Sequence, residues 1–420
     1  MTSSNSANTS PGHRRWLAPG ALLVTVLVAY MNRLNISLAL PAITAEFGWS
    51  VAESGAYGGR LLGLFYIGYA ASNVLLSGPA ARMGVRRSMV LMMVLFSACT
   101  MLGGLVAGSL ALLIGSRLLL GIAQGPHFPL MTTLTKHWFP PRERSRANGI
   151  FIGGMLIAPL LTPVLFVPVV ELWGWRVMLF TVGAGGLLVS LPGLLLLIYD
   201  TPRHAPFVSH EEAAYIEANM ETDEPVERDW RFLCSANFWL ASLIAILNNF
   251  TVFGVMFWLP IYFTKTHHLP FSDLWYAATL PYFIGFAGLG VMAWLGDALN
   301  RRVLLAGIGY LLTAGCVFFA AISGHVFMAI AWFAVAVFFQ FAYGAQEFAI
   351  LQRILPRSAI SNGAGIYNGI AVLGGGLLST EGIGRIVEYT GTYTAGLLSV
   401  VVGATATGLV LLYLSRSLKY

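Results

Sequence analysis

The sequence predicts an all-α polytopic membrane protein with twelve transmembrane helices in two pseudo-symmetric six-helix bundles. Of its 420 residues, 57% are hydrophobic and only 10% are charged, whereas soluble domains carry about 25% charged residues. Apolar runs of about 20 residues, long enough to cross ~30 Å of hydrocarbon as helices, recur about twelve times. One long polar segment divides these runs into six and six.

The expected spans set the organisation of the chain. Residues 1–15 are rich in Ser, Asn and Thr and are expected to form a disordered cytoplasmic N-terminus. Residues 16–199 are expected to form the first six-helix bundle, residues 237–415 the second, and residues 416–420 a cytoplasmic tail. The expected spans are 16–40, 55–77, 88–107, 110–134, 147–170, 177–199, 237–263, 273–296, 303–322, 326–352, 360–380 and 392–415.

Residues 200–236 are expected to form a cytoplasmic linker between the bundles. They hold half of the 18 acidic residues of the chain. Within them, Ser209-His-Glu-Glu212 fits a capping box, in which the serine hydroxyl and the glutamate carboxylate satisfy backbone amides at a helix start. The sequence therefore predicts a short amphipathic surface helix that ends before Glu221.

The two halves of the chain resemble each other weakly. Leu40-Pro41 is predicted to end the first span and Leu259-Pro260 the seventh, 219 residues later. The loop after the second span begins with Ala81 and the loop after the eighth with Asp297, 216 residues later. Similar offsets indicate an internal duplication, which is common among secondary transporters.

The basic residues predict the orientation in the membrane. If both termini are cytoplasmic, 18 of the 24 Lys and Arg residues fall in cytoplasmic segments. Because cytoplasmic loops are enriched in Lys and Arg, we expect a multi-pass protein of the inner (plasma) membrane with both termini inside. The net charge of +6 then reflects topology, and no feature indicates binding to nucleic acid.

No catalytic or metal-binding pattern is present in the sequence. The cysteines Cys99, Cys234 and Cys316 are scattered, so neither a disulfide framework nor a metal site follows from them. The metalloprotease motif H-E-x-x-H and the hydrolase motif G-x-S-x-G do not occur. The sequence therefore predicts a protein that is not an enzyme and that needs no cofactor or metal.

Charged residues inside apolar runs are the best indicators of a functional site. Arg33, Arg60 and Arg117 lie in such runs in the first half without an acid beside them. An intramembrane cation costs about 2.5–3.5 kcal/mol on insertion scales, so it usually faces a polar interior. Arg60 is close enough to the end of its span to snorkel to the interface. For Arg33 and Arg117 we expect anion binding, with a purely structural role as the alternative.

Several motifs, in order and at matching spacing, resemble the major facilitator superfamily and, within it, the anion:cation symporter family of organic-acid transporters. The resemblance runs from about Tyr30 to Leu414. It implies two six-helix bundles around a central site that operate by alternating access. The motifs are Arg117-Leu-Leu-Leu-Gly-Ile-Ala-Gln-Gly-Pro-His-Phe-Pro129, Trp173-Gly-Trp-Arg176, Thr201-Pro-Arg203, Trp258-Leu-Pro-Ile-Tyr262, Leu280-Pro-Tyr282 and Gly365-Ile-Tyr-Asn368.

The resemblance also implies a set of substrate-binding residues around a central site. Residues of the first bundle would bind the carboxylate, and polar residues of both bundles would recognise hydroxyls or a ring. The loops after the second and eighth spans would act as gating or structural motifs. The implied substrate-binding residues are Tyr30, Arg33, Arg117, Gln124, Asn248, Glu347 and Asn368. The implied loop-motif residues are Arg82, Arg86, Arg87, Asp297, Arg301 and Arg302.

The chain departs from the family pattern at the positions that usually carry the proton. Asn32 and Gln124 stand where sugar-acid members have acids, and neither can ionise. Glu347 is the only acid deep in any predicted span, and a bound anion beside it would favour its protonated form. We therefore consider Glu347 the main candidate for proton coupling. The alternatives are a permanent pair with Arg33 or Arg117, or a position at the cytoplasmic interface.

His127 is a second candidate for proton coupling, because an imidazole titrates near neutral pH. It lies three residues after Gln124, in the same predicted span. The alternative for a lone helix histidine is a packed side chain with a satisfied hydrogen bond.

Together these features predict a secondary active transporter of a small organic anion, either a monocarboxylate or a sugar acid, with proton symport as the energy source. The expected partners are the organic anion, protons and the lipid bilayer, and the expected state is a monomer. An uncoupled uniporter or an anion exchanger on the same fold is the first alternative. An exporter of amphipathic compounds and a receptor that binds without transport are less favoured. The sequence does not decide between an aromatic acid, an aldonate, a uronate and a small dicarboxylate.

Overall fold

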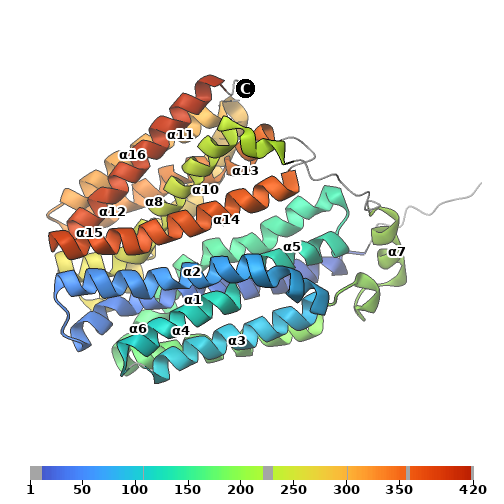
Figure 1. Cartoon of the computed structure of the whole chain (residues 1–420), viewed down its shortest axis with the longest axis horizontal. Helices are drawn as coiled ribbons and strands as arrows, with labels where there is room; N and C mark the ends of the chain where they lie inside the picture. Colours follow the sequence, from blue (N-terminus) through green and yellow to red (C-terminus); the bar gives the residue numbers. More distant parts are fainter. Residues whose placement is uncertain (1–11, 107, 221–229, 300, 356–359, 418–420) are drawn as a thin grey trace, which may run out of the picture.

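The computed structural model describes residues 12–106, 108–220, 230–299, 301–355 and 360–417, and every regular element in these ranges is a helix (Figure 1). The first half of the chain contributes one group of long helices. They are α1 (Leu17–Glu46), α2 (Val51–Met83), α3 (Val85–Leu105), α4 (Leu110–Gln124), α5 (His127–Trp138) and α6 (Pro141–Leu197).

The second half contributes another group, and most helix contacts are made within each group. Its members are α8 (Ala236–Thr266), α9 (Leu274–Ala277), α10 (Leu280–Leu299), α11 (Arg302–Ile322), α12 (Val326–Gly344), α13 (Glu347–Ile354), α14 (Ile360–Leu377), the π-helical turn η6 (Leu378–Gly382), α15 (Ile383–Thr390) and α16 (Tyr393–Ser417). The short helix α7 (His210–Ala218) lies between the groups in sequence and beyond one end of the helices in space, which we call the α7 end (Figure 1).

Ten helical stretches of the described residues are long and apolar enough to cross a membrane. They cover eleven of the twelve predicted runs, because one stretch contains two of them. The predicted fifth and sixth spans are joined into one 57-residue helix with a bend at Gly174, whose φ is 84°. The fourth span is broken into two shorter helices at Gly125-Pro126, because proline has no amide hydrogen to continue the helical pattern.

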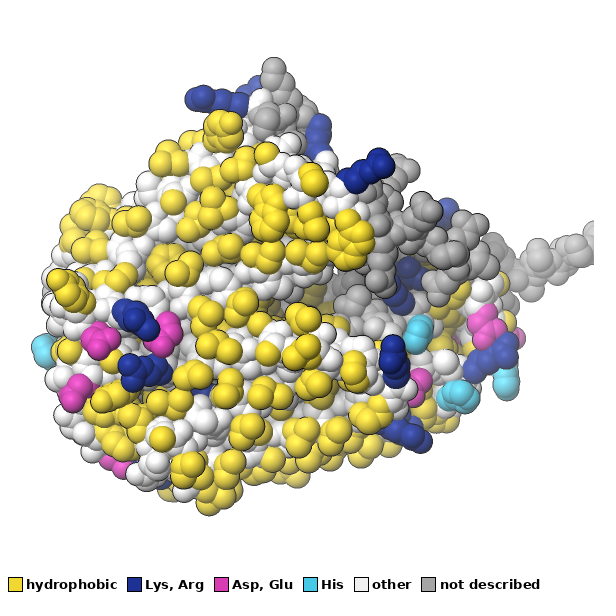
Figure 2. Space-filling model, in the orientation of Figure 1, with side chains coloured by type: hydrophobic (Ala, Val, Ile, Leu, Met, Phe, Trp, Pro, Cys, Tyr) yellow, Lys and Arg dark blue, Asp and Glu magenta, His cyan; other side chains and the backbone are white. Residues whose placement is uncertain are grey.

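The surface of the helices has the character expected in a bilayer. Figure 2 shows hydrophobic side chains over most of the visible face, with charged side chains mainly near the ends. Large apolar residues such as Leu105 on α3 and Leu188 on α6 are 70% and 77% exposed. Exposed apolar surface on this scale is unfavourable in water and favourable against lipid. The predicted class of all-α polytopic membrane protein is confirmed.

The prediction that Pro41 and Pro260 end their spans is wrong. Pro41 lies inside α1, which continues to Glu46, and Pro260 lies inside α8, which continues to Thr266. Proline removes one backbone hydrogen bond but does not stop a helix whose neighbours pack around it and satisfy the freed groups. Both prolines are buried among neighbouring helices.

A short helix, α7, lies where the sequence predicts a surface helix after the first bundle. The Glu212 amide donates to Ser209 Oγ at 3.1 Å, which is one half of the predicted capping box. The Glu212 carboxylate, however, accepts from the backbone and guanidinium of Arg15, at 3.1 and 3.0 Å. Arg15 also pairs with Glu143 on α6 at 3.0 Å. This buried ion cluster attaches α7 to the first group of helices.

The two groups of helices touch closely at the end opposite α7. A Cβ atom on Gly55 of α2 would lie 2.7 Å from the backbone oxygen of Gly384 on α15, so only glycine permits this approach. Ser37 Oγ of α1 donates to the Phe257 carbonyl of α8 at 2.6 Å. These contacts close the seam between the two groups at the end opposite α7.

The groups separate towards the α7 end. Gly376 and Gly369 on α14 are seven residues apart and therefore face nearly the same direction. A Cβ on Gly376 would lie 2.5 Å from the Tyr66 ring of α2, whereas a Cβ on Gly369 would meet nothing within 4 Å. The half of α2 near the α7 end is exposed at Val74. The space between the groups is therefore open on one side only.

The attachment of α7 gives a stability prediction. Glu212→Gln removes the charge that accepts from Arg15, so we expect a loss of about 1.5–3 kcal/mol, typical for a hydrogen bond between charged groups. Thermal unfolding of the purified protein should show a melting temperature lowered by several degrees. Glu217→Gln, which breaks the exposed pair with Arg203, is the control and should change it little. Equal shifts in the two variants would contradict this account.

Candidate functional site

Arg33 lies in a pocket of aromatic rings inside the first group of helices. Its guanidinium carbon is 4.5 Å from the ring centre of Tyr30, 4.8 Å from that of Tyr69 and 4.9 Å from that of Phe65. Tyr30 is one turn before Arg33 on α1, and Phe65 and Tyr69 are one turn apart on α2, so helical spacing places all three rings around one cation. Only 6% of Arg33 is exposed.

The partners of Arg33 in the described structure are all neutral. Its Nε donates to Gln124 Oε1 of α4 at 3.0 Å, and the Gln124 amide nitrogen donates to the Ala29 carbonyl at 3.3 Å. The Nη2 atom of Arg33 is buried and has no hydrogen-bond partner. Cation–π contacts offset part of the cost of burying the charge, but the pocket retains an uncompensated cation with a free donor. Such a site is suited to a carboxylate.

Arg117 of α4 is buried on the other side of α1. Its Nη1 donates to the Asn32 carbonyl at 3.2 Å and to Asn35 Oδ1 at 3.1 Å. Among the described residues, its Nε and Nη2 atoms have no hydrogen-bond partner. The Asn32 side chain is itself engaged, because its oxygen accepts from Thr100 at 2.5 Å. Arg117 therefore lies buried between α4 and α1 in the first group of helices.

His127 occupies the start of α5, after the break in the fourth span. Its Nε2 atom is 3.2 Å from Thr25 Oγ1, its ring packs near Phe96 and Phe128, and its Nδ1 atom has no partner. The histidine is 2% exposed. Its surroundings resemble those of a packed side chain with one hydrogen bond, and its role in proton coupling stays a prediction.

The second group of helices contains a network of tyrosines around Glu347. The Tyr367 hydroxyl of α14 donates to Glu347 Oε1 at 2.9 Å and lies 2.6 Å from the Tyr343 hydroxyl of α12. Tyr310 of α11 packs edge-on against Tyr343 and donates to Asn248 Oδ1 of α8. Glu347 and Asn248, which the sequence singled out, are thus linked through three tyrosines.

Asn368 lies on α14 next to Tyr367 but differs from the network. Its side chain is exposed, and Gly365 and Gly369 beside it have open space around them. It lies on the part of α14 where the two groups have separated. This position makes it accessible from the α7 end.

The structure thus forms two separate clusters from the predicted residues. Tyr30, Arg33 and Gln124 lie together in the first group, and Asn248 and Glu347 lie together in the second. Among the described contacts, neither a hydrogen bond nor an ion pair joins the clusters. The alternative of a permanent pair between Glu347 and Arg33 or Arg117 finds no support in these contacts, since the carboxylate bonds to Tyr367.

The loop motifs after the second and eighth spans bond to acids from different parts of the chain. In the second half, Arg302 pairs with Asp297 at 2.6 Å, and Arg301 is exposed. In the first half, where Ala81 replaces the acid, Arg82 and Arg87 are exposed. The acid is supplied instead by Asp200, whose Oδ1 accepts from the Arg86 amide at 3.0 Å.

Glu381, which the predicted spans left outside the membrane, lies inside a membrane-crossing stretch of the structure. The predicted eleventh span stopped at residue 380, but the helix continues through η6 to Thr390 and ends at Gly391, whose φ is 68°. Glu381 therefore lies within a membrane-crossing stretch, and a Cβ on Gly59 of α2 would be 3.3 Å from its Oε2. In the sequence, Gly391 was the available signal for this later helix end, because glycine commonly takes the left-handed conformation that ends a helix. Glu347 is not the only acid within a span.

Comparison with known proteins gives consistent results over nearly the whole chain. The model of the Major Facilitator Superfamily matches residues 22–379. The chain is 26% identical over 385 residues to the D-galactonate transporter of Escherichia coli O6:H1, covering 87% of each protein. It is 28% identical over 412 residues to the quinolone resistance transporter of Acinetobacter baumannii, covering 94% of this chain and 92% of that protein.

A solved structure supports the fold. The bacterial homologue of the human lysosomal transporter Spinster, in an inward-facing and unoccupied conformation, superposes with a TM-score of 0.77. The identity is 19%, and the match covers 96% of this chain and 98% of that chain. The predicted arrangement of helices is confirmed by this likeness.

The one-sided opening gives a labelling prediction. In a variant that lacks Cys99, Cys234 and Cys316, Asn368→Cys should react with a water-soluble maleimide added from the α7 side, because this position faces open space. Ser379→Cys is the control, since Ser379 is 0% exposed. Labelling of membrane vesicles of known orientation measures this difference. Slow labelling of both positions would show that the cavity is closed at the α7 end.

Proposed function

Because this chain belongs to the Major Facilitator Superfamily, we propose that it is a secondary transporter of a small organic anion, a monocarboxylate or a sugar acid. The observation that carries the proposal is the buried cation of Arg33. A charge removed from water is costly unless it is paired. In this site the missing partner would be the carboxylate of the substrate.

The Arg33 pocket fits an anion in geometry as well as in charge. Its free Nη2 donor can form a charge-assisted hydrogen bond, and a guanidinium can bind both oxygens of a carboxylate. The rings of Tyr30 and Tyr69 offer flat surfaces and hydroxyls close to the same cation. The relative that transports D-galactonate, a sugar acid, supports this class of substrate.

The substrate would cross by alternating access. The closed seam at Gly55 and Gly384 and the open space at Gly369 fit a state that exposes the site to one side. With both termini in the cytoplasm, as the basic residues predict, this state faces inward in the plasma membrane. Transport would require the glycine seam to open and the α7 end to close.

Proton coupling, in this proposal, depends on Glu347. Asn32 and Gln124 cannot carry a proton, whereas Glu347 can, and Tyr367 hydrogen-bonds to it. An anion in the cavity between the groups would favour the neutral form of Glu347 through electrostatic repulsion. Loading of the anion and of the proton would then be linked. Without such a link the protein would be a uniporter or an exchanger.

Export of an amphipathic compound is the second candidate function. The similarity to the quinolone resistance transporter of Acinetobacter baumannii favours it. The two functions differ in what the pocket should bind, because a neutral or cationic drug gains nothing from Arg33. A thermal-shift screen that compares small organic acids with amphipathic amines lacking a carboxylate separates them, since a ligand that binds the folded state raises its melting temperature.

The proposal predicts the effect of changing Arg33. With D-galactonate as the first probe, Arg33→Gln should weaken binding about 10- to 100-fold, equivalent to one charge-assisted hydrogen bond of about 1.5–3 kcal/mol. Arg33→Lys keeps the charge but not the two-pronged geometry, so its affinity should lie between those of the wild type and Arg33→Gln. Binding is measured by calorimetry on the purified protein. Arg60→Gln, at an exposed position of α2, is the control.

Undiminished binding of organic acids by Arg33→Gln would exclude this site. If no organic acid stabilises the wild-type protein while an amphipathic amine does, the export function is the correct one.

The coupling hypothesis predicts a second phenotype. Glu347→Gln should retain exchange of labelled substrate across vesicle membranes but lose accumulation driven by an acidic exterior, because the glutamine cannot carry the proton. Glu388→Gln, an exposed acid on α15, is the control and should accumulate substrate like the wild type. Undiminished pH-driven accumulation by Glu347→Gln would place the coupling group elsewhere.

A further inference from the structure

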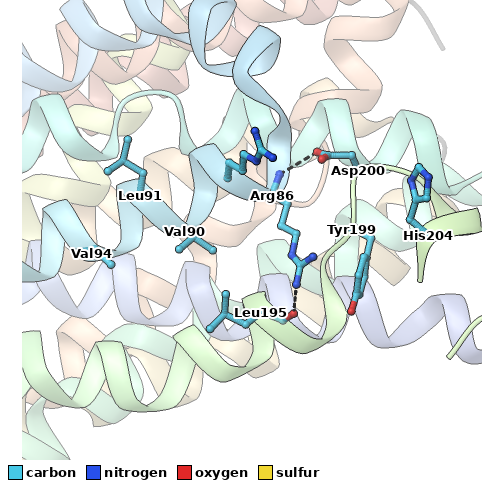
Figure 3. Close-up of a pocket in the computed structure, with 9 residues that line it drawn as sticks. Arg86, Val90, Leu91, Val94, Leu195, Tyr199, Asp200 and His204 are labelled. Carbon is cyan, nitrogen blue, oxygen red and sulfur yellow. Dashed lines mark hydrogen bonds between the residues drawn. The ribbon is translucent and has the colours of Figure 1, made fainter. Parts of the chain in front are cut away.

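A groove of about 620 Å³ lies on the first group of helices at the α7 end, between α3 and the end of α6 (Figure 3). It is separate from the Arg33 pocket, with which it shares no lining residue. The residues that line it are Arg86, Arg87, Val90, Leu91, Val94, Leu195, Tyr199, Asp200 and His204.

The groove has an apolar part and a polar part. Val90, Leu91 and Val94 follow one another along α3, and Leu195 faces them from α6 (Figure 3). Leu91, Val94 and Leu195 are 47%, 40% and 43% exposed. In a helix that crosses a membrane, exposed apolar side chains of this kind lie against acyl chains. The polar residues lie at the end of the groove, where α3 begins.

Arg86 is fixed in the wall of the groove. Its amide donates to Asp200 Oδ1 at 3.0 Å, its guanidinium donates to the Leu195 carbonyl, and its guanidinium carbon lies 4.3 Å from the ring centre of Tyr199 (Figure 3). One carboxylate oxygen of Asp200 thus accepts a hydrogen bond from the backbone of α3. Among the described residues, no acid pairs with the Arg86 guanidinium.

Arg87 and His204 complete the polar end. Both are exposed, and the His204 ring bonds only locally, with Nδ1 at 2.8 Å from Thr201 Oγ1. Arg87 makes no described hydrogen bond or ion pair. Two arginines and a histidine therefore face one acid, and the acid is already engaged. The polar end attracts an anion, and the apolar part begins within one helical turn of it.

We propose that this groove binds a membrane phospholipid with an anionic head group. The phosphate would lie at Arg87 and Arg86, and one acyl chain would follow Val90, Leu91 and Val94. Basic pockets beside transmembrane helices attract anionic lipid head groups. A soluble anion would use the arginines but would leave the adjoining apolar surface uncovered. The combination of both features in one groove favours a lipid.

The bound lipid would join two parts of the chain that are distant in sequence. Its phosphate would contact the start of α3, and its chain would lie between α3 and the end of α6. It would thereby stabilise the contact between Arg86 and Asp200, which holds the loop motif after α2. This inference does not depend on the identity of the transported substrate.

Native mass spectrometry of the full-length protein tests the proposal. The protein is exchanged into detergent with phosphatidylglycerol, phosphatidylethanolamine or phosphatidylcholine, and the bound lipid is counted. We expect phosphatidylglycerol to bind at least about threefold better than the other two. Arg87→Gln should reduce its binding about three- to tenfold, and Arg87→Lys should restore part of it. Arg142→Gln, an exposed arginine at the same end but outside the groove, is the control.

A second variant tests the apolar part. Val94→Trp should fill the groove and reduce phosphatidylglycerol binding without changing its charge. The proposal is overturned if Arg87→Gln and Arg142→Gln reduce lipid binding equally, since this would indicate a general electrostatic effect. It is also overturned if inorganic phosphate at millimolar concentration displaces the lipid or if Val94→Trp has no effect, since a free anion would then suffice.

Discussion

The burial of a cation without an acidic partner is the constraint on which the account of this protein rests. Arg33 is surrounded by three aromatic rings and a glutamine, and its Nη2 donor is left unsatisfied. An unpaired buried charge costs free energy that folding must supply from elsewhere. A site with an unpaired buried charge can offset this cost by binding a group of the opposite charge. The aromatic rings lower the cost without neutralising the cation.

The second group of helices has a complementary character, and the two groups meet asymmetrically. There an acid, Glu347, accepts a hydrogen bond from Tyr367 within a network of hydroxyls. The seam between the groups is closed by glycine contacts at the end opposite α7 and open towards α7. A substrate in the opening would lie between a cation on one side and an acid on the other. In the proposed function, this asymmetry links anion binding to proton binding.

The fold could be predicted well from the sequence, because each membrane-crossing helix requires an apolar run of sufficient length. The sequence also singled out Arg33, which the structure shows to be buried beside neutral partners, and its role in a site stays a prediction. It failed at Pro41 and Pro260, because packing within a bundle allows helices to continue through proline. The tyrosine partners of Glu347 come from three different helices, so no local spacing could reveal them. Asp200 replaces the acid missing at Ala81 from 119 residues away, which only the folded chain shows.

A structure of the protein determined with a bound organic acid would test the central claim most directly. The account predicts density for the carboxylate within about 3 Å of the Arg33 guanidinium, the distance of a charge-assisted hydrogen bond, with the rings of Tyr30 and Tyr69 beside the rest of the molecule. A bound acid located elsewhere in the cavity, with Arg33 still unpaired, would contradict it.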